Sequence, residues 1–275
     1  MRQALLSSMA RARVRPWPDD PTIRHLVLLD LSAVPTVDEV RTWIEEVRAP
    51  SPAAPGTLER GTGPTAAPLA QLPAPRAIRT GALFPEAADA FRAAGFGELD
   101  RLALLRHDLD RIPRRRPRRL APVRLHRLRP ADLAVAARLD AAAFPPGWAN
   151  DEASLLDIAD ATPSARLRLA SRRDDAAPGR PRSIGRRGEP VGFAITGRAG
   201  PTGYLQRLAV HPRSRRAGAA RLLVEDSIRW SAHRGADQLL VNTGVANAPA
   251  LELYERTGFR RLDAELVVLE LPLAR

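Results

Sequence analysis

The loop between Val210 and the helix expected from Gly218 has the composition of an anion-binding site. It reads Arg215-Arg-Ala-Gly-Ala-Ala, so two arginines precede four small residues. The first four backbone amides of a helix lack partners within the helix, and its dipole is positive there. Small side chains leave those amides uncovered, which suits a pyrophosphate. The candidate anion cradle consists of Arg215, Arg216, Ala217, Gly218, Ala219 and Ala220. Tight packing onto a sheet would explain the same small residues, and the loop is neither a Walker A nor a GxGxxG motif.

A second polar pair lies on a helix expected over residues 247–257. Asn247 and Tyr254 are seven residues apart, which is roughly 10 Å along one helix face. Ala250 between them is small and lets a ligand lie across that face. A phenol with a pKa near ~10 can donate a proton to a thiolate. The alternative is that Asn247 is only the helix N-cap and Tyr254 a core aromatic residue.

Together these segments resemble the signatures of the GNAT acetyltransferase superfamily. The loop matches Gln/Arg-x-x-Gly-x-Gly/Ala after the strand end Val210-x-Pro212, and residues 247–259 match Asn-x-x-Ala-x-x-x-Tyr-x-x-x-Gly-Phe. The resemblance covers residues 122–275 and implies an α/β (α+β) fold, a GNAT-like mixed sheet flanked by helices. Arg216 is a departure, because the family often has Gly at that place.

The resemblance implies an N-acetyltransferase with acetyl-CoA as co-substrate and no metal. Tyr254 would protonate the departing CoA thiolate, and Asn247 would hold the pantetheine arm. The backbone of Leu208, Ala209 and Val210 would align the same arm. The acceptor would be a small-molecule or peptide amine that attacks the thioester directly.

The base that accepts the ammonium proton is left open by the sequence. Gln206 stands where several GNAT enzymes carry a Glu, and an amide cannot accept a proton. The alternatives are Asp151, Glu152, a water chain or an amine that arrives neutral. Residues 140–165 and the N-terminal half would form the walls of the acceptor pocket.

Apolar periodicity and turn signals indicate alternating strands and helices after residue 122, as in a mixed α/β or α+β layer. Strands are expected over residues 123–128, 166–171, 191–197, 204–210, 238–242 and 265–271. Helices are expected over residues 131–144, 151–160, 218–233 and 247–257.

The N-terminal half is expected to be a smaller, degenerate domain of similar elements. Residues 86–96 align with 249–259 at a constant offset of 163, which puts Phe91 at the place of Tyr254 and Phe84 at that of Asn247. Phenylalanine has no hydroxyl to donate, and no Gly/Arg loop precedes the helix expected over 36–49. This resembles tandem GNAT proteins, in which one repeat catalyses. The other elements expected are strands over 22–34, 77–83 and 99–109 and a helix over 85–94.

Composition leaves two rival functions open. The 275-residue chain has a net charge of +12, and all 43 basic residues are Arg. Nine arginines and no acidic residue lie within 111–129, so one rival is a nucleic-acid-binding protein. However, prolines there forbid a continuous recognition helix and aromatic residues for base stacking are absent. The other rival is a GNAT-like module that binds CoA without catalysis.

The absence of Cys excludes disulfides, thiolate metal sites and a Cys nucleophile. No apolar run approaches the ~20 residues of a membrane helix, so the expectation is a cytoplasmic protein without a membrane partner. The expected organisation is a disordered lead (1–21), the degenerate half (22–110) with an inserted loop (50–75), an Arg/Pro linker (111–121) and the catalytic domain (122–275).

Overall fold

The computed structural model describes residues 10–17, 20–29, 34–49, 58–60, 72–110, 123–172 and 188–273, with 58–60 described by their backbone alone. The chain divides into two compact units: unit 1 is residues 1–103 with 263–275, and unit 2 is residues 104–262. The strands β5 (Gly97–Asp108) and β11 (Arg260–Pro272) therefore contribute residues to both units. This division differs from the expected boundary at residues 111–121.

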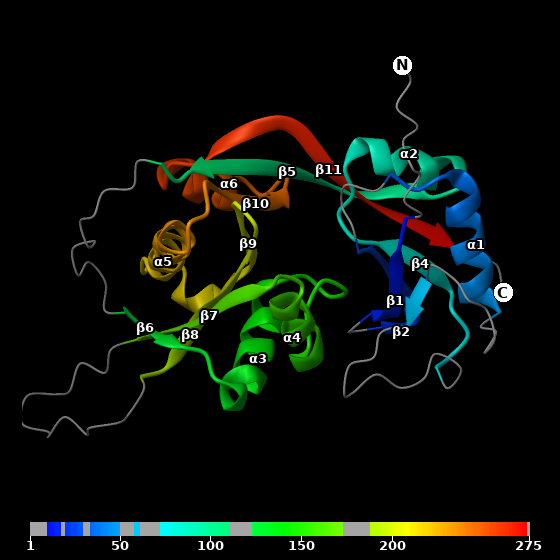
Figure 1. The fold of residues 1–275 in the computed structure, drawn as a ribbon. Helices are drawn as coiled ribbons and strands as arrows, with labels where there is room; N and C mark the ends of the chain where they lie inside the picture. Colours follow the sequence, from blue (N-terminus) through cyan, green and yellow to red (C-terminus); the bar gives the residue numbers. More distant parts are fainter. Residues whose placement is uncertain are drawn as a thin grey trace, which may run out of the picture. The chain divides into compact units, whose positions relative to one another are not determined.

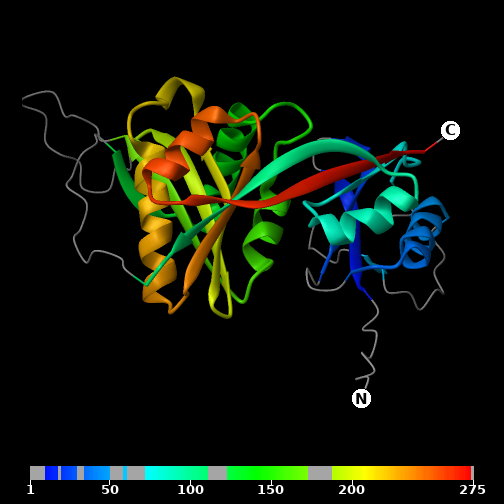
Figure 2. The same cartoon turned by 90° about the horizontal axis from the view of Figure 1, so that it is seen from above.

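Unit 2 is a mixed sheet with helices α3 and α4 on one face and α5 on the other (Figures 1 and 2). Its strand order is β5-β10-β9-β8-β7-β6. Strands β6 to β9 pair antiparallel in sequence order, and β10 joins β9 in parallel. The elements are β6 (Val123–Arg127), η2 (Pro130–Asp132), α3 (Leu133–Ala143), α4 (Glu152–Asp160), β7 (Ser164–Arg172), β8 (Pro190–Ala199), β9 (Thr202–Val210), η3 (Pro212–Ser214), α5 (Ala219–His233), β10 (Gln238–Gly244) and α6 (Ala248–Arg256).

The apolar faces of α3 and α4 pack on β7, β8 and β9. Leu139 and Leu155 from the helices meet Leu169, Phe193 and Ile195 from the strands, all 5% exposed or less. On the other sheet face, α5 buries Leu223, Val224 and Ile228. Burial of these side chains is what fixes the helices on the sheet, because each large apolar side chain stabilises the fold by roughly 1.5–3 kcal/mol.

Unit 1 is a smaller sheet whose core contains residues from both α1 and α2. The strand order is β3-β1-β2-β4-β11-β5, in which β2 and β4 are parallel and α1 connects them. Trp43 and Phe91 are fully buried and pack against Val267 and Leu269 of β11. The elements are β1 (Ala12–Trp17), β2 (Asp20–Leu28), α1 (Val37–Arg48), β3 (Leu58–Arg60), β4 (Ala77–Thr80) and α2 (Pro85–Ala93).

The expectation of a disordered lead over 1–21 is wrong for β1 and for the start of β2. Ala12 pairs with Leu28 and Val14 with Leu26. Both β1 side chains are at most 1% exposed in the unit 1 core, because alternate β1 residues point into it. Within the expected loop 50–75, Leu58–Arg60 form β3 in parallel with β1.

The C-terminal strand also departs from the expected domain boundaries. The strand expected over 265–271 is longer, and its distal part pairs antiparallel with β4, where Glu270 opposes Arg79. The side chains of Arg79 and Glu270 are largely buried, and their ion pair has an Nη2–Oε2 distance of 2.7 Å. These contacts, with Val267 and Leu269 in the core, place residues 263–273 in unit 1 rather than with the rest of the expected catalytic domain.

The internal repeat is visible in the two units at the same offset of 163 residues. Helix α2 covers Pro85–Ala93 and α6 covers Ala248–Arg256. Each is followed by a glycine in the left-handed region, Gly95 at φ 99° and Gly258 at φ 95°. The next amide then donates back to the helix, Phe96 N to Phe91 O at 3.1 Å and Phe259 N to Tyr254 O at 3.0 Å.

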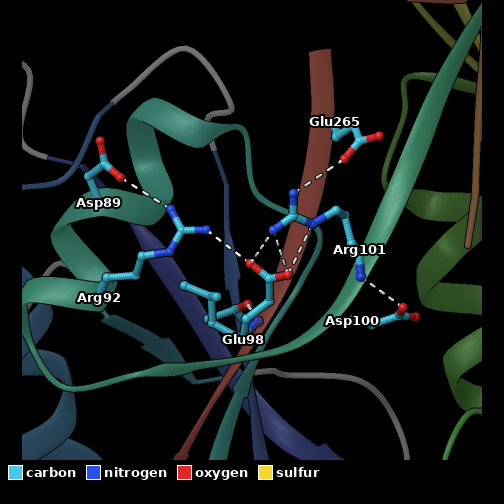
Figure 3. A network of polar contacts seen from close by, with 8 residues as sticks. Asp89, Arg92, Glu98, Asp100, Arg101 and Glu265 are labelled. Carbon is cyan, nitrogen blue, oxygen red and sulfur yellow. Dashed lines mark hydrogen bonds and ion pairs between the residues drawn. The ribbon is translucent and has the colours of Figure 1, made fainter. Parts of the chain in front are cut away.

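A polar network ties α2, β5 and β11 together within unit 1 (Figure 3). Glu98 accepts from Arg101 at 2.9 Å and from Arg92 at 3.3 Å, while Arg101 also lies 3.6 Å from Glu265. The hydrogen bond with Arg101 is the main cause that lowers the pKa of Glu98. Because these side chains are partly exposed, the network is worth little stability and mainly fixes register.

Several expectations fall on residues that the structure does not describe. They are the start of the lead (1–9), most of the inserted loop 50–75 and the Arg/Pro linker 111–121. The nucleic-acid interpretation rests largely on the Arg/Pro linker. Within the described ranges, no helix is long and apolar enough to cross a membrane.

Candidate active site

The predicted anion cradle is a tight turn that leads from β9 into α5. The 3-10 turn η3 follows β9, and Gly218 is the N-cap of α5 in the left-handed region, at φ 81°. The first intrahelical bond is donated by Leu222 N to Gly218 O at 3.1 Å. The amides of Ala219, Ala220 and Arg221 therefore precede the helical ladder. The cap has no side-chain hydrogen bond and the first turn has no acidic residue, so this end of α5 can accept an anion.

Arg216, the predicted departure from the family signature, has a left-handed backbone at φ 63°. A residue with a Cβ pays about 1–2 kcal/mol in that region, whereas Gly does not. A glycine, which the family often has at this place, would adopt this backbone without that strain. In this protein an arginine adopts the left-handed backbone, and the Arg216 side chain is exposed beside the cradle.

Strand β9 stops pairing with β10 before it reaches the anion cradle. The β9–β10 ladder covers Thr202 to Tyr204. Beyond Tyr204, up to Val210, β9 pairs with β8 alone among the described strands. The β9 edge that contains Leu208, Ala209 and Val210 is therefore released from β10, and its backbone groups are available to an extended ligand.

The β9 strand also carries a bulge at Gln206. Ile195 of β8 opposes Arg207 and Thr196 opposes Leu205, so Gln206 is the extra residue. Its Oε1 atom is buried without a hydrogen-bond partner. A Cβ at Gly197 would lie 2.5 Å from Gln206 Oε1 and 2.3 Å from Thr162 Oγ1, so the Gln206 side chain packs across β8. The residue at the place where a base was sought, Gln206, is therefore an amide whose oxygen is buried.

Helix α6 holds the predicted pair Asn247 and Tyr254. Asn247 is the N-cap: its Oδ1 accepts from Ala250 N at 3.4 Å and its Nδ2 donates to Thr243 Oγ1 at 3.0 Å. Tyr254 is 5% exposed, and its ring lies 5.5 Å from that of Phe259. Burial raises the pKa of Tyr254 above its ordinary value, so the phenol stays protonated throughout the physiological range. The contacts therefore agree with the alternative interpretation, in which Asn247 is the helix N-cap and Tyr254 is a core aromatic residue, and they do not exclude the proposed roles.

The two acidic candidates for the base differ in their contacts. Asp151 is the N-cap of α4 and accepts from Ser154 N at 2.8 Å. Glu152 is exposed in the first turn of that helix. Within the described ranges no group of three or more His, Asp and Glu could hold a metal ion.

Two buried carboxylates of unit 2 were not foreseen from the sequence. Asp140 of α3 is fully buried and pairs with Arg207 of β9, and Asp226 of α5 pairs with Arg166 of β7. Both acids lie on the buried, largely apolar face of their helix. A charged residue in an apolar stripe is the sequence signal that could have found them, because a buried charge requires a partner.

In unit 1 the equivalent positions are closed to a ligand. Thr36 Oγ1 accepts from Glu39 N at 3.2 Å, and Glu39 Oε2 accepts from Thr36 N at 2.7 Å. This capping box puts a carboxylate over the N-terminus of α1. Phe91 is fully buried and Phe84 caps α2 without a side-chain hydrogen bond. No phosphate cradle or phenol donor exists at these positions.

Comparison with known proteins supports this geometry. Residues 147–259 match the model of the acetyltransferase (GNAT) family. A mycothiol acetyltransferase from Acidothermus cellulolyticus is 31% identical over 84 residues, which is 29% of this chain and 26% of that protein. The match thus spans about a quarter of this curated relative's length.

Solved structures share the fold over more of the chain. A GCN5-related N-acetyltransferase from Kribbella flavida aligns with a TM-score of 0.54 and 14% identity, over 91% of this chain and 82% of that one. A tandem GNAT protein from the clavulanic acid biosynthesis pathway aligns with a TM-score of 0.51 and 12% identity, over 74% and 66%. At these identities the likeness concerns the fold alone. The family match, the two signatures and the geometry of α5, β9 and α6 agree: residues 147–259 form an acetyltransferase domain of the GNAT family.

Proposed function

We propose that this protein transfers the acetyl group of acetyl-CoA to a primary amine by direct attack, with Tyr254 as the general acid. The observation that carries the proposal is the released edge of β9, which runs into the uncovered N-terminus of α5. An extended pantetheine with a pyrophosphate at one end requires such a pair: an unpaired strand edge, then an anion cradle.

The CoA moiety is assigned to named groups. The amides of Ala219 and Ala220 would bind the pyrophosphate, with Gly218 giving close approach and Arg215 and Arg216 adding charge. Backbone groups of Leu208, Ala209 and Val210 would align the pantetheine, as a strand pairs with a neighbour. Ala217 completes the turn, and Asn247 would contact the same arm from the start of α6.

The contrast between the two helix N-termini supports CoA binding by unit 2. Helix α1 has Asp38 and Glu39 in its first turn, and Glu39 already accepts hydrogen bonds from Thr36 N and Ala10 N. A pyrophosphate there would meet two carboxylates. Helix α5 has no acid in its first turn, so the dipole is available to the ligand.

Tyr254 would donate the proton that the departing thiolate needs. Its pKa is raised by burial, which makes it a weaker acid. Desolvation also raises the basicity of the thiolate, so both partners of the proton transfer shift in the same direction as the carbon–sulfur bond breaks. The amine nitrogen forms the new bond to the acetyl carbon, the thiol leaves with the Tyr254 proton, and the proton that the nitrogen loses returns to the Tyr254 phenolate through water.

The acceptor amine would reach the site neutral or lose its proton through water. Gln206 cannot accept a proton, and Asp151 is engaged at the cap of α4. Residues 140–165 would form one wall of the acceptor site. A small-molecule amine is compatible with the mycothiol acetyltransferase relative, and a peptide amine is the other class we propose.

A mass-spectrometric screen of amine libraries tests the function. The full chain is incubated with acetyl-CoA, and acetylated products are measured together with release of the CoA thiol. Transfer to an amine with equimolar thiol release is the expected result. CoA binding by titration calorimetry without thiol release for any amine would leave a binding module and refute catalysis.

A further inference from the structure

The most constrained charged side chain of unit 2 outside the predicted site is Arg207. Its Nε donates to Asp140 Oδ1 at 2.7 Å and its Nη2 to Asp140 Oδ2 at 2.6 Å, a bidentate pair. Nη2 also donates to the carbonyl of Trp148 at 2.8 Å. The guanidinium carbon lies 3.4 Å from the centroid of the Phe144 ring. The guanidinium is thus held in plane by hydrogen bonds and on one side by an aromatic ring.

The partner carboxylate is committed to the same segment. Asp140 is fully buried, and its Oδ2 also accepts from the backbone amide of Asn150 at 2.7 Å. The side-chain amide of Asn150 lies within hydrogen-bond distance of this pair as well. Asp140 and Arg207 therefore anchor both ends of the segment 144–150, through Phe144, the Trp148 carbonyl and the Asn150 amide.

The Asp140–Arg207 pair also connects segment 144–150 to the bulge of β9. Arg207 directly follows the extra residue Gln206 and precedes Leu208, where the released edge assigned to pantetheine begins. Segment 144–150 links α3 to α4 and belongs to the proposed acceptor wall. One guanidinium therefore connects the strand that would carry the acetyl donor to the segment that would face the acceptor.

We propose that Arg207, braced by Asp140, is a positioning residue that sets the acceptor wall 144–150 relative to the donor edge of β9. The proposal rests on the proposed function. It assigns Arg207 to acceptor recognition and reaction geometry, without contact to the reacting atoms. Misplacement of a bound reactant by about 1 Å can reduce the rate roughly 10²-fold, so a loose wall is costly even where the fold persists.

The substitution Arg207→Lys tests the brace, because Lys keeps the charge but cannot form a bidentate pair with Asp140 and reach Trp148. We expect kcat/KM for the acceptor to fall about 10- to 100-fold, with a raised acceptor KM, and the Kd of acetyl-CoA to stay within about twofold, since no CoA contact is changed. Hydrogen exchange of the Asn150 amide should accelerate at least about tenfold, because its acceptor Asp140 loses its fixed position.

The chain offers a matched control in Arg166→Lys. Arg166 also forms a bidentate pair with a buried carboxylate, Asp226, at 2.6 and 3.0 Å, but this pair joins β7 to α5, and Arg168 lies 3.2 Å from the same carboxylate. The substitution should lower the free energy of unfolding and leave the acceptor KM and Asn150 exchange unchanged. If Arg207→Lys fails to fold, the double variant Asp140→Leu/Arg207→Met replaces the pair by apolar groups, which buried pairs often tolerate. It should show the same acceptor defect.

The outcomes separate the two proposals. A wild-type protein that acetylates no amine is a failure of the proposed function. An active Arg207→Lys enzyme with unchanged acceptor KM and a protected Asn150 amide overturns the positioning role alone. A rise in acceptor KM in the Arg166→Lys control would overturn it too, by showing a general effect of stability.

Discussion

Gly218 offers the most direct test of the anion cradle, because the effect of backbone strain and the effect of an added charge can be separated there. At φ 81°, any residue with a Cβ is strained by about 1–2 kcal/mol. The variants Gly218→Gln and Gly218→Glu share that strain and have side chains of the same shape. Their difference therefore reports on charge at the start of α5 alone.

The expected difference follows from simple electrostatics. Two like charges about 4 Å apart at a partly exposed site repel by between about 1 and 4 kcal/mol, depending on the local dielectric. We take about 2 kcal/mol for a carboxylate beside the pyrophosphate, which is a ratio of roughly 30 in the Kd of CoA. Both variants should melt a few degrees below wild type.

Titration calorimetry with CoA, paired with thermal unfolding, measures both quantities. The Kd ratio between the Glu and Gln variants should shrink when the ionic strength is raised well above 0.1 M, because salt screens exposed charges. If the two folded variants bind CoA equally at low salt, the pyrophosphate does not lie at the N-terminus of α5 and the assignment of residues 215–220 fails.

Three further expectations concern single side chains. Tyr254→Phe should lower kcat about 10²–10⁴-fold with little change in acetyl-CoA affinity, because only the donor is lost and the ring contact with Phe259 remains; near-normal turnover when chemistry limits the rate would return Tyr254 to a core role. Arg216→Gly should raise the free energy of unfolding by about 0.5–1 kcal/mol in urea titrations, since φ 63° then costs nothing; a destabilised variant would contradict the strain. The hydrogen bond from Thr22, then that from Arg76, lowers the pKa of Asp20 to about 2, so Asp20 stabilises the fold above its unfolded pKa near 3.8 and loses this effect as pH falls through about 2. Asp20→Asn should therefore cost up to about 1 kcal/mol at pH 7 and almost nothing near pH 2, and an equal cost at both pH values would exclude the ionic origin.

The sequence was most informative where local chemistry decides structure. The repeat at an offset of 163 residues is such a local pattern, and the structure confirms it in α2 and α6 and in the left-handed glycine that follows each helix. The small residues around Gly218 similarly predict a tight strand-to-helix turn, because few backbones other than a left-handed one can make it.

Long-range pairing was beyond the sequence. Ala12 and Val14 alternate with arginines over only a few residues, and pairing with β2 is what makes this segment a strand. The pair of Asp140 and Arg207 joins residues 67 positions apart. One sequence without relatives gives no signal for such a contact beyond a charge on an apolar face.

The membership of residues 263–273 in unit 1 has a consequence for the order in which the protein can be made. Leu83 N donates to Val267 O at 2.9 Å, and Val267 N donates to Leu83 O at 2.9 Å. Val267 and Leu269 also fill the core around Phe91. On the ribosome, domains generally fold as they emerge, N-terminal first. Unit 1 cannot be completed until residues 263–273 have been translated, after all of unit 2, so unit 2 can complete its own elements up to α6 before unit 1 does. During synthesis the edge of β4 that pairs with β11 stays unpaired, and it is in that interval that the nascent chain would most need a chaperone.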